Sequence, residues 1–76
     1  MKELLETIAK ALVTNPDAVS VKVIEEEETI MELYVAEEDM GRIIGKQGRI
    51  AKAIRSVMKS AAIKDGIRVR VDIIQG

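Results

Sequence analysis

Apolar residues recur along this chain at two spacings, one helical and one strand-like, and these spacings predict its elements. Apolar side chains three and four positions apart predict a helix over residues 2–14. Asn15-Pro16-Asp17 ends this helix, because proline has no N–H to donate and disfavours a helical residue before it. The apolar face of the helix is expected to comprise Leu4, Leu5, Ile8, Ala11 and Leu12.

Alternation of apolar and polar residues predicts three half-buried strands, over residues 18–25, 29–36 and 68–74. The side chains expected to face inward are Val19, Val21, Val23, Met31, Leu33, Val35, Val69, Val71 and Ile73. The four glutamates of residues 25–28 join the first two strands. They lack the spaced Asp, Asn and Gly residues of a calcium loop, so they predict a solvated hairpin tip rather than a cation site.

Two helices separated by a glycine-containing turn are predicted between the second and third strands. A short helix over residues 40–44 is expected to end at Gly45, and a longer helix over residues 48–64 is expected to stop at Gly66. Acidic residues 37–39 suit the positive end of the helix dipole. The inward stripe of the longer helix is expected to be Ile50, Ala53, Ile54, Val57 and Ala61.

The order of the predicted elements indicates the fold class. Helix, strand, strand, helix, helix and strand predict an α+β domain in which helices pack on one face of a three-stranded sheet. A chain of 76 residues suits one domain, so residues 1–76 are interpreted as a single unit without a linker or an internal repeat.

The composition limits the chemistry of this domain. The sequence contains no cysteine and no histidine, which removes disulfides, thiolate chemistry and the commonest general base. Neither an enzyme nor a protein with a cofactor or metal is expected. There is no long uncharged apolar run, and the N-terminus alternates charged and apolar residues, so we expect a cytoplasmic protein.

The net charge of −1 hides a strong asymmetry between the two halves of the chain. Residues 1–40 carry three bases against eleven acids, a net −8, whereas residues 41–76 carry nine bases against two acids, a net +7. A chain with this overall charge is a poor polyanion binder on average, but binding depends on the local field. The positive charge is concentrated in the half that holds the glycine turn.

A glycine-containing octapeptide, Ile43-Ile44-Gly45-Lys46-Gln47-Gly48-Arg49-Ile50, lies in this basic half. Glycine lets a backbone turn tightly and approach a ligand closely, because it has no side chain. A loop that opens a helix also directs free N–H groups and the positive end of the helix dipole toward that ligand. With Lys46, Arg49 and Lys52 beside it, the loop predicts the binding of phosphates, and hence of a polyanion.

Two close glycines alone indicate only a turn, so the surrounding pattern matters. Here an apolar pair precedes them and a basic amphipathic helix follows. A nucleotide-binding P-loop is disfavoured, because the glycine spacing is one residue too short and neither Ser nor Thr follows Lys46. Tyr34 is the only aromatic residue, which argues against the stacking platforms of other RNA-binding folds, and we expect Tyr34 to serve packing.

The octapeptide resembles the signature of the KH domain, which is a hydrophobic pair, Gly-X-X-Gly and a following apolar residue. A helix-strand-strand unit before the loop and one strand after it resemble the type II arrangement typical of bacteria. The whole chain, including Asn15-Pro16-Asp17 and Asp39-Met40-Gly41-Arg42, is similar to the small stand-alone bacterial KH proteins of the KhpA type.

The resemblance implies a protein that binds single-stranded RNA and acts as an RNA chaperone or post-transcriptional regulator. KH domains clamp about four nucleotides of backbone with the Gly-X-X-Gly loop. The resemblance also implies homodimers, heteromers with the larger KhpB (Jag-like) protein and, in some bacteria, an influence on cell elongation and the envelope.

Carried onto this sequence, the motif predicts a phosphate clamp beside an apolar groove. Gly45 and Gly48 let the strand lie on the loop, and Lys46 and Gln47 form its tip. Apolar residues of the motif, with a side chain from the second strand, are expected to form a groove that reads base edges. The predicted RNA-binding residues are Arg42, Ile43, Ile44, Gly45, Lys46, Gln47, Gly48, Arg49, Ile50 and Lys52.

Two other functions remain open from the residues alone. The fold could serve only protein–protein assembly, with the loop unused, or the clamp could hold single-stranded DNA, because it does not itself require a 2′-hydroxyl. The C-terminal half of the long helix carries more apolar residues than one small sheet needs, so we expect a dimer surface there. The residues expected in that surface are Val57, Met58, Ala62 and Ile63. Arg68 and Arg70 are expected to be solvated.

Overall fold

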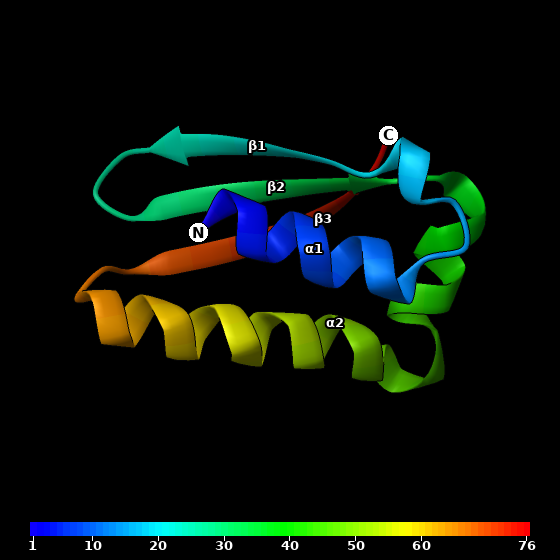
Figure 1. The fold of residues 1–76 in the computed structure, drawn as a ribbon. Helices are drawn as coiled ribbons and strands as arrows, with labels where there is room; N and C mark the ends of the chain where they lie inside the picture. Colours follow the sequence, from blue (N-terminus) through cyan, green and yellow to red (C-terminus); the bar gives the residue numbers. More distant parts are fainter.

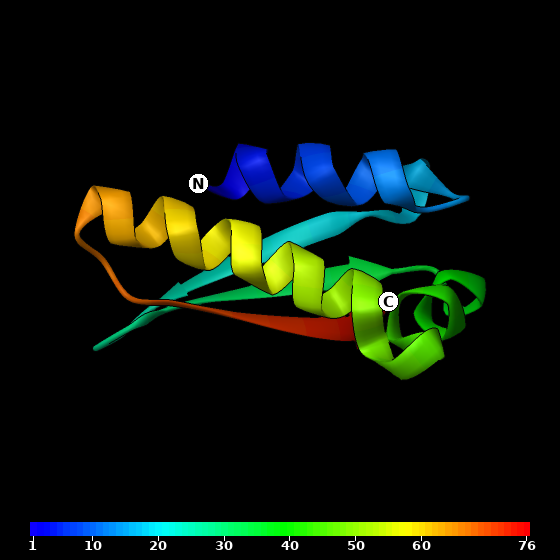
Figure 2. The same ribbon diagram turned by 90° about the horizontal axis from the view of Figure 1, so that it is seen from below.

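A three-stranded sheet with two helices on one face forms the domain, as the computed structural model shows (Figures 1 and 2). The structure describes residues 1–76, with the exception of the side chain of Lys46. Its elements are α1 (Lys2–Leu12), the 3₁₀ turn η1 (Pro16–Ala18), β1 (Ser20–Glu25), β2 (Thr29–Val35), α2 (Glu37–Asp65) and β3 (Val69–Gln75). The expected α+β fold is confirmed. None of the described helices combines the length and apolar character needed to cross a membrane.

The sheet has the order β1-β2-β3, with β1 antiparallel and β3 parallel to the central strand β2. The register aligns Val23, Met31 and Val71 in one row across the inner face. Met31, Leu33 and the other residues expected to face inward are buried or half-buried. The period-2 pattern therefore predicted all three strands and their inner face correctly, because alternation fixes the face that each residue takes.

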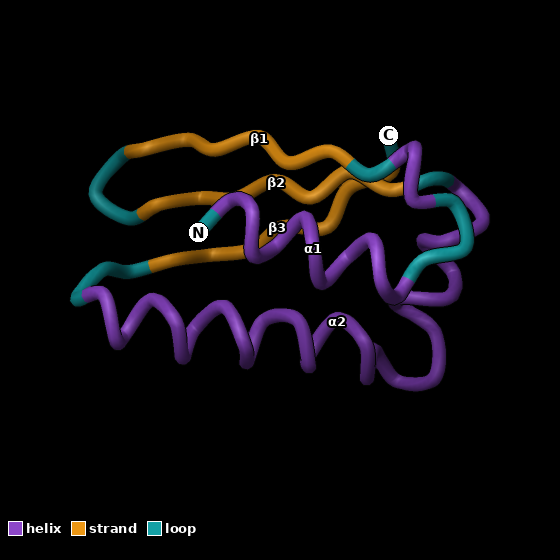
Figure 3. The backbone as a smooth tube through the Cα atoms, in the orientation of Figure 1, coloured by secondary structure: helices purple, strands orange, loops and turns teal.

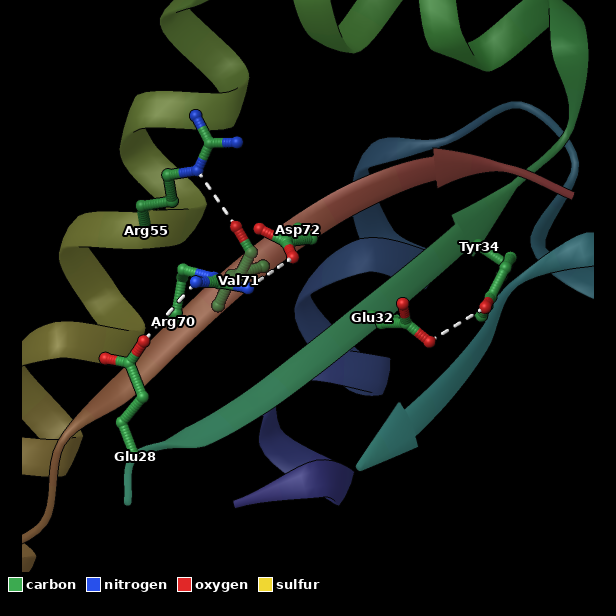
Figure 4. Close-up of polar contacts among 7 residues, drawn as sticks. All are labelled: Glu28, Glu32, Tyr34, Arg55, Arg70, Val71 and Asp72. Carbon is green, nitrogen blue, oxygen red and sulfur yellow. Dashed lines mark hydrogen bonds and ion pairs between the residues drawn. The ribbon is translucent and has the colours of Figure 1, made fainter. Parts of the chain in front are cut away.

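The outer face of the sheet carries polar contacts (Figure 4). Tyr34 donates its hydroxyl to Glu32 at 2.9 Å, and this hydrogen bond raises the pKa of the Tyr34 phenol. Arg70 is 53% exposed, as expected, and it also forms surface ion pairs with Glu28 at 3.4 Å and with Asp72 at 3.3 Å (Figure 4). Glu28 is within reach because the start of β3 lies beside the hairpin tip, and Asp72 because it lies two residues along the same strand, on the same face.

Helix α1 packs on the sheet through a face that differs slightly from the predicted one. Leu5 and Ala9 are fully buried, whereas Leu4 is 39% exposed and Ala11 is also exposed. Adjacent residues in a helix point about 100° apart, so with Leu5 directed into the core Leu4 lies at the edge of the apolar face. The sequence pattern missed Ala9, which lies one turn after Leu5 and brings the helix close to the sheet.

The buried stripe of α2 is also rotated from the predicted one. Ala51, Ile54, Met58 and Ala62 are buried, whereas Val57 is 45% exposed. Both stripes have helical spacing and share Ile54, and the longer side chain of Met58 occupies the core. The predicted dimer surface is therefore wrong for Met58 and Ala62, because neither reaches the surface of the domain. Ala53, also expected inside, is exposed.

The axis of α2 changes direction where the sequence predicted a turn (Figure 3). Helical assignment runs without a gap through Glu37–Asp65, but Gln47 and Gly48 have left-handed φ angles of 65° and 68°. The bend therefore falls two residues after Gly45, which was expected to end the first helix. The stop at Gly66 is confirmed, since Gly66 has a φ of 72° and its N–H bonds back to the last turn.

Candidate nucleic-acid interface

Gly45 and Gly48 bracket the bend of α2 and differ in what requires them to be glycine. Gly48 has a left-handed φ of 68°, which L-residues with a side chain rarely adopt. Gly45 lies in the helix without a positive φ, and a Cβ atom added there would meet no protein atom within 4 Å. The fold explains the glycine at position 48, but it does not explain the glycine at position 45.

A groove of about 320 Å³ opens on this side of α2 and is lined by Gly41, Arg42, Gly45 and Ile50. Gly41 and Gly45 are one helical turn apart, and a Cβ atom on either would meet no protein atom within 4 Å. The structure thus brings together three residues of the predicted site and adds Gly41. The four-residue spacing of the two glycines was the signal that could have identified it.

The two isoleucines before Gly45 take different environments. Ile43 is fully buried in the core, so its predicted place in the groove is wrong. Ile44 is 51% exposed and offers an apolar surface beside the bend. Adjacent helical residues face different directions, so only one of the pair could reach a ligand.

The strand beside the long part of α2 is β3, not the second strand that the sequence suggested as a groove wall. Among the described residues that line the 320 Å³ groove, none comes from β2. Val69 and Val71 of β3 instead line a neighbouring groove of about 170 Å³ with Arg55 and Lys59. The parallel crossover places β3 at the edge of the sheet, next to α2.

Basic side chains follow the bend along α2. Arg49 and Lys52 are exposed, as is Gln47 at the tip of the bend. None of the ion pairs among the described side chains involves Arg49 or Lys52, so their charge is not neutralised within the domain. Lys46 was also predicted to bind phosphate, and its side chain lies outside the described part of the chain.

Arg55 continues this basic side and was missed by the sequence interpretation. Its Nε donates to the carbonyl oxygen of Val71 at 3.2 Å, which joins α2 to the edge strand (Figure 4). The spacing of Lys52, Arg55 and Lys59, three and four residues apart, could have identified one helix side.

Arg42 makes a structural contact in addition to lining the groove. Its Nε donates to the carbonyl oxygen of Leu12 at 3.1 Å, at the end of α1. The last carbonyls of a helix lack intrahelical partners, so this bond satisfies one of them. The side chain remains exposed, and its role in ligand binding stays a prediction.

Asp39 is fully buried in the first turn of α2. It accepts hydrogen bonds from the Thr14 N–H at 2.9 Å, the Thr14 hydroxyl at 2.9 Å and the Asn15 N–H at 3.1 Å. The bond from the Thr14 backbone lowers the pKa of Asp39 most, and the other two bonds and Arg42 add to this effect against the cost of burial. From the sequence we expected only that Asp39, in the first turn, would interact favourably with the positive end of the helix dipole.

The charge asymmetry of the sequence is only partly reproduced in space. The acidic hairpin tip between β1 and β2 and the bend of α2 lie at opposite ends of the molecule (Figure 1). The hairpin end carries charge of both signs, since Arg68 and Arg70 line the same hollow as the glutamates, whereas Arg49 and Lys52 lie exposed beyond the bend.

Comparison with known proteins identifies the family of this chain. The family profile described as KhpA/KhpB, KH domain, matches residues 2–73. The chain is 64% identical to a protein of Clostridium acetobutylicum and 61% identical to one of Clostridium perfringens, in each case over 75 residues, 97% of this chain and 100% of the relative. A protein of Chlamydia trachomatis is 45% identical over 76 residues, 99% of this chain and 97% of the relative. All three are named RNA-binding protein KhpA.

Solved structures support the fold. A variant of Era from Aquifex aeolicus, bound to GDP and AlF4⁻, superposes with a TM-score of 0.66 and 22% identity over 95% of this chain and 28% of that one. Era in complex with MgGDPNP and nucleotides 1506–1542 of 16S ribosomal RNA gives a TM-score of 0.62 and 23% identity, with the same coverage. At these identities the likeness concerns the fold alone. Given the family match over residues 2–73 and relatives that are 64% and 61% identical over their full length, the chain belongs to the KhpA/KhpB family of KH-domain proteins.

Proposed function

We propose that this chain binds single-stranded RNA by holding the sugar-phosphate backbone against the bend at residues 45–48. Membership of the KH family supports this, because KH domains clamp about four nucleotides with a Gly-X-X-Gly loop. The relatives named RNA-binding protein KhpA support RNA as the ligand.

The observation that carries the proposal is the environment of Gly45. In a helical position with open space around it, alanine would be more stable than glycine by about 0.5–1 kcal/mol. A ligand that lies directly on the backbone supplies the missing reason for glycine, because a methyl group would hold that ligand away. Gly41, one turn earlier, extends the same bare surface into the groove.

The electrostatics favour a phosphate strand. Arg49 and Lys52 are exposed, and no partner among the described side chains neutralises them. With roughly three or four phosphates held, the logarithm of affinity should fall with the logarithm of salt concentration with a slope of about −2 to −3.

Bases are expected to be read by their edges in an apolar groove. Ile50 lines that groove and Ile44 is exposed beside the bend. Tyr34 is the only aromatic residue, and by alternation with buried Leu33 and Val35 it points away from the helices. Stacking on aromatic rings therefore contributes little to this mode of binding.

A charge reversal at the bend tests the proposal. The double variant Lys46→Asp/Gln47→Asp changes the charge by three units at the tip, and Asp tolerates the left-handed conformation of position 47. The matched control Lys2→Asp/Thr7→Asp makes the same change on exposed positions of α1. Fluorescence anisotropy with an unstructured oligoribonucleotide should show loss of binding for the first variant alone, with unchanged circular dichroism. Equal binding by both variants would remove the bend from the mechanism.

The finer role belongs to the same proposal. We expect binding without catalysis, in the cytoplasm, as an RNA chaperone or post-transcriptional regulator. A matched oligodeoxyribonucleotide distinguishes RNA from single-stranded DNA, since only contacts to the 2′-hydroxyl separate the two. Equal affinity for both would replace RNA by single-stranded nucleic acid as the ligand class.

Self-association through α2 is part of the proposal, because one KH module binds few nucleotides and two linked modules gain avidity. Val57 is 45% exposed and Ile63 is 68% exposed, which leaves apolar surface on α2 for a homodimer. The family description joins KhpA and KhpB, which supports a heteromer with a KhpB protein as a further assembly. Val57→Asp or Ile63→Asp should give a monomer by light scattering, and a variant that stays dimeric would exclude that residue from the interface.

A further inference from the structure

Asp39 joins two segments that are far apart in the sequence. Its carboxylate accepts three hydrogen bonds, of 2.9, 2.9 and 3.1 Å, from Thr14 and Asn15 in the segment that follows α1. It is the only charged side chain among those described that is buried, and its exposed fraction is 0%. We name these three residues the Asp39 anchor.

The Asp39 anchor lies on one side of the first part of α2, and the opposite side of that part lines the groove. Successive residues turn by about 100° around a helix, so Asp39 and Ile43 face one side, and Gly41 and Gly45 face the opposite side. Ile43 is fully buried, whereas Gly41 and Gly45 line the groove. The part of α2 before the bend is therefore held by contacts of Asp39 and Ile43, on the side opposite the groove.

Arg42 adds a second link three residues after Asp39. Its Nε donates to the Leu12 carbonyl oxygen at 3.1 Å, so two positions of α2, three residues apart, are tied to the end of α1 and to the residues that follow it. Two links along one segment fix its direction as well as its position, because a single link would leave it free to pivot.

A carboxylate suits this task better than an apolar side chain. Burying a charge is costly unless it is hydrogen-bonded, and Asp39 meets that condition with three donors. The bonds are directional, whereas apolar contacts tolerate sliding. A substitution that removes the acceptor would also leave two backbone N–H groups without this partner.

We propose that Asp39 is a positioning residue for RNA binding, which fixes the orientation of residues 37–46 and thereby presents the bend at residues 45–48 to the phosphate strand. The inference rests on the proposed function. Asp39 does not touch the ligand; it acts through the backbone of Gly41 and Gly45. Loss of the anchor lets this segment pivot, and RNA binding then has to restore its orientation, which should weaken affinity about tenfold.

The test compares Asp39→Asn with a core variant that also lowers stability. Asp39→Asn keeps the shape of the side chain but replaces one acceptor oxygen with an NH₂ donor, which faces Thr14 and Asn15 donors. Val23 pairs with Met31 in the sheet and takes no part in the hydrogen bonds of the Asp39 anchor. Val23→Ala should therefore lower stability while the anchor stays intact. Both are measured with a ten-nucleotide unstructured oligoribonucleotide, well below their melting temperatures.

Asp39→Asn should weaken binding about tenfold, and Val23→Ala should leave it within about twofold. Amide exchange in residues 37–46 should accelerate in Asp39→Asn while that of Leu33 in β2 stays protected. Wild-type affinity in Asp39→Asn, or an equal loss of affinity in Val23→Ala, would overturn the inference.

If Asp39→Asn does not fold, Thr14→Val provides a second test, because it removes one of the three bonds. This variant should weaken binding about twofold to threefold, and unchanged affinity would overturn the inference. A wild-type chain that binds no oligoribonucleotide would instead refute the proposed function itself.

Discussion

Gly45 and Gly48 stand three residues apart at one bend, yet only Gly48 has a backbone conformation that requires glycine. This difference predicts opposite stability effects for the two alanine variants. Gly45→Ala should raise the free energy of unfolding by about 0.5–1 kcal/mol, because alanine favours the helix. Gly48→Ala should lower it by about 1–2 kcal/mol, because a left-handed residue then carries a Cβ atom.

Both alanine variants should nevertheless weaken RNA binding. Loss of one hydrogen bond to a phosphate, about 1.5 kcal/mol, corresponds to about a tenfold loss of affinity. Urea unfolding and anisotropy titrations measure the two quantities separately. A Gly45→Ala variant that is both more stable and fully active would show that the ligand does not need a bare backbone at this position.

The hydrogen bond from Arg55 in α2 to Val71 in β3 is expected to contribute to the stability of the domain. Arg55→Met keeps the aliphatic stem but removes the bond to the Val71 carbonyl, so the free energy of unfolding should fall by about 1 kcal/mol. Lys59→Met is the matched control, because it removes the same charge from an exposed position of the same helix. Thermal melting should separate the two variants. Equal melting temperatures would mean that the bond contributes nothing measurable.

The lowered pKa of Asp39 predicts how stability depends on pH. Folding favours the charged carboxylate, so its contribution is fully present above the ordinary value of 3.8 and is lost as pH falls through the lower pKa of the folded state. Wild type and Asp39→Asn should differ most in unfolding free energy near neutral pH, and the difference should shrink below about pH 4. A difference that stays constant down to pH 2 would contradict this assignment.

The acidic hairpin tip should have little effect on RNA affinity at physiological salt. The molecule extends 34 Å along its longest axis, and the hairpin and the bend lie at its two ends (Figure 1). Charges are screened over about 8 Å at that ionic strength, so Glu26→Gln/Glu27→Gln should leave the equilibrium affinity unchanged. A large gain in affinity would place the RNA closer to the hairpin than proposed.

The sequence predicted the strands better than the helix faces, for a physical reason. A period of two assigns each strand residue such as Leu33 to one face without ambiguity. In α2, two stripes of helical spacing share Ile54, and alanines on both make them similar in hydrophobicity. The size of Met58, which the space above the sheet accommodates, selects the stripe that is buried.

Parts of the site were beyond sequence reasoning because they depend on tertiary neighbours. The motif itself predicted the bend, the groove residue Ile50 and the exposed basic side chains Arg49 and Lys52. Nothing in the sequence pairs Asp39 with Thr14, because this contact exists only once α1 packs beside α2. The burial of Ile43 rather than Ile44 likewise depends on how the segment is turned against the core.

The parallel pairing of β3 with β2 also has a consequence for the order of folding. Thr29 to Val69 spans forty residues, including all of α2, whereas the β1–β2 hairpin closes over a few residues. Closing the longer loop costs more chain entropy and contributes to slower folding. The hairpin should therefore gain amide protection before β3 does in pulse-labelling experiments, and simultaneous protection would contradict this order. The sheet edge that packs beside α2 is then completed in a late kinetic step, when β3 docks.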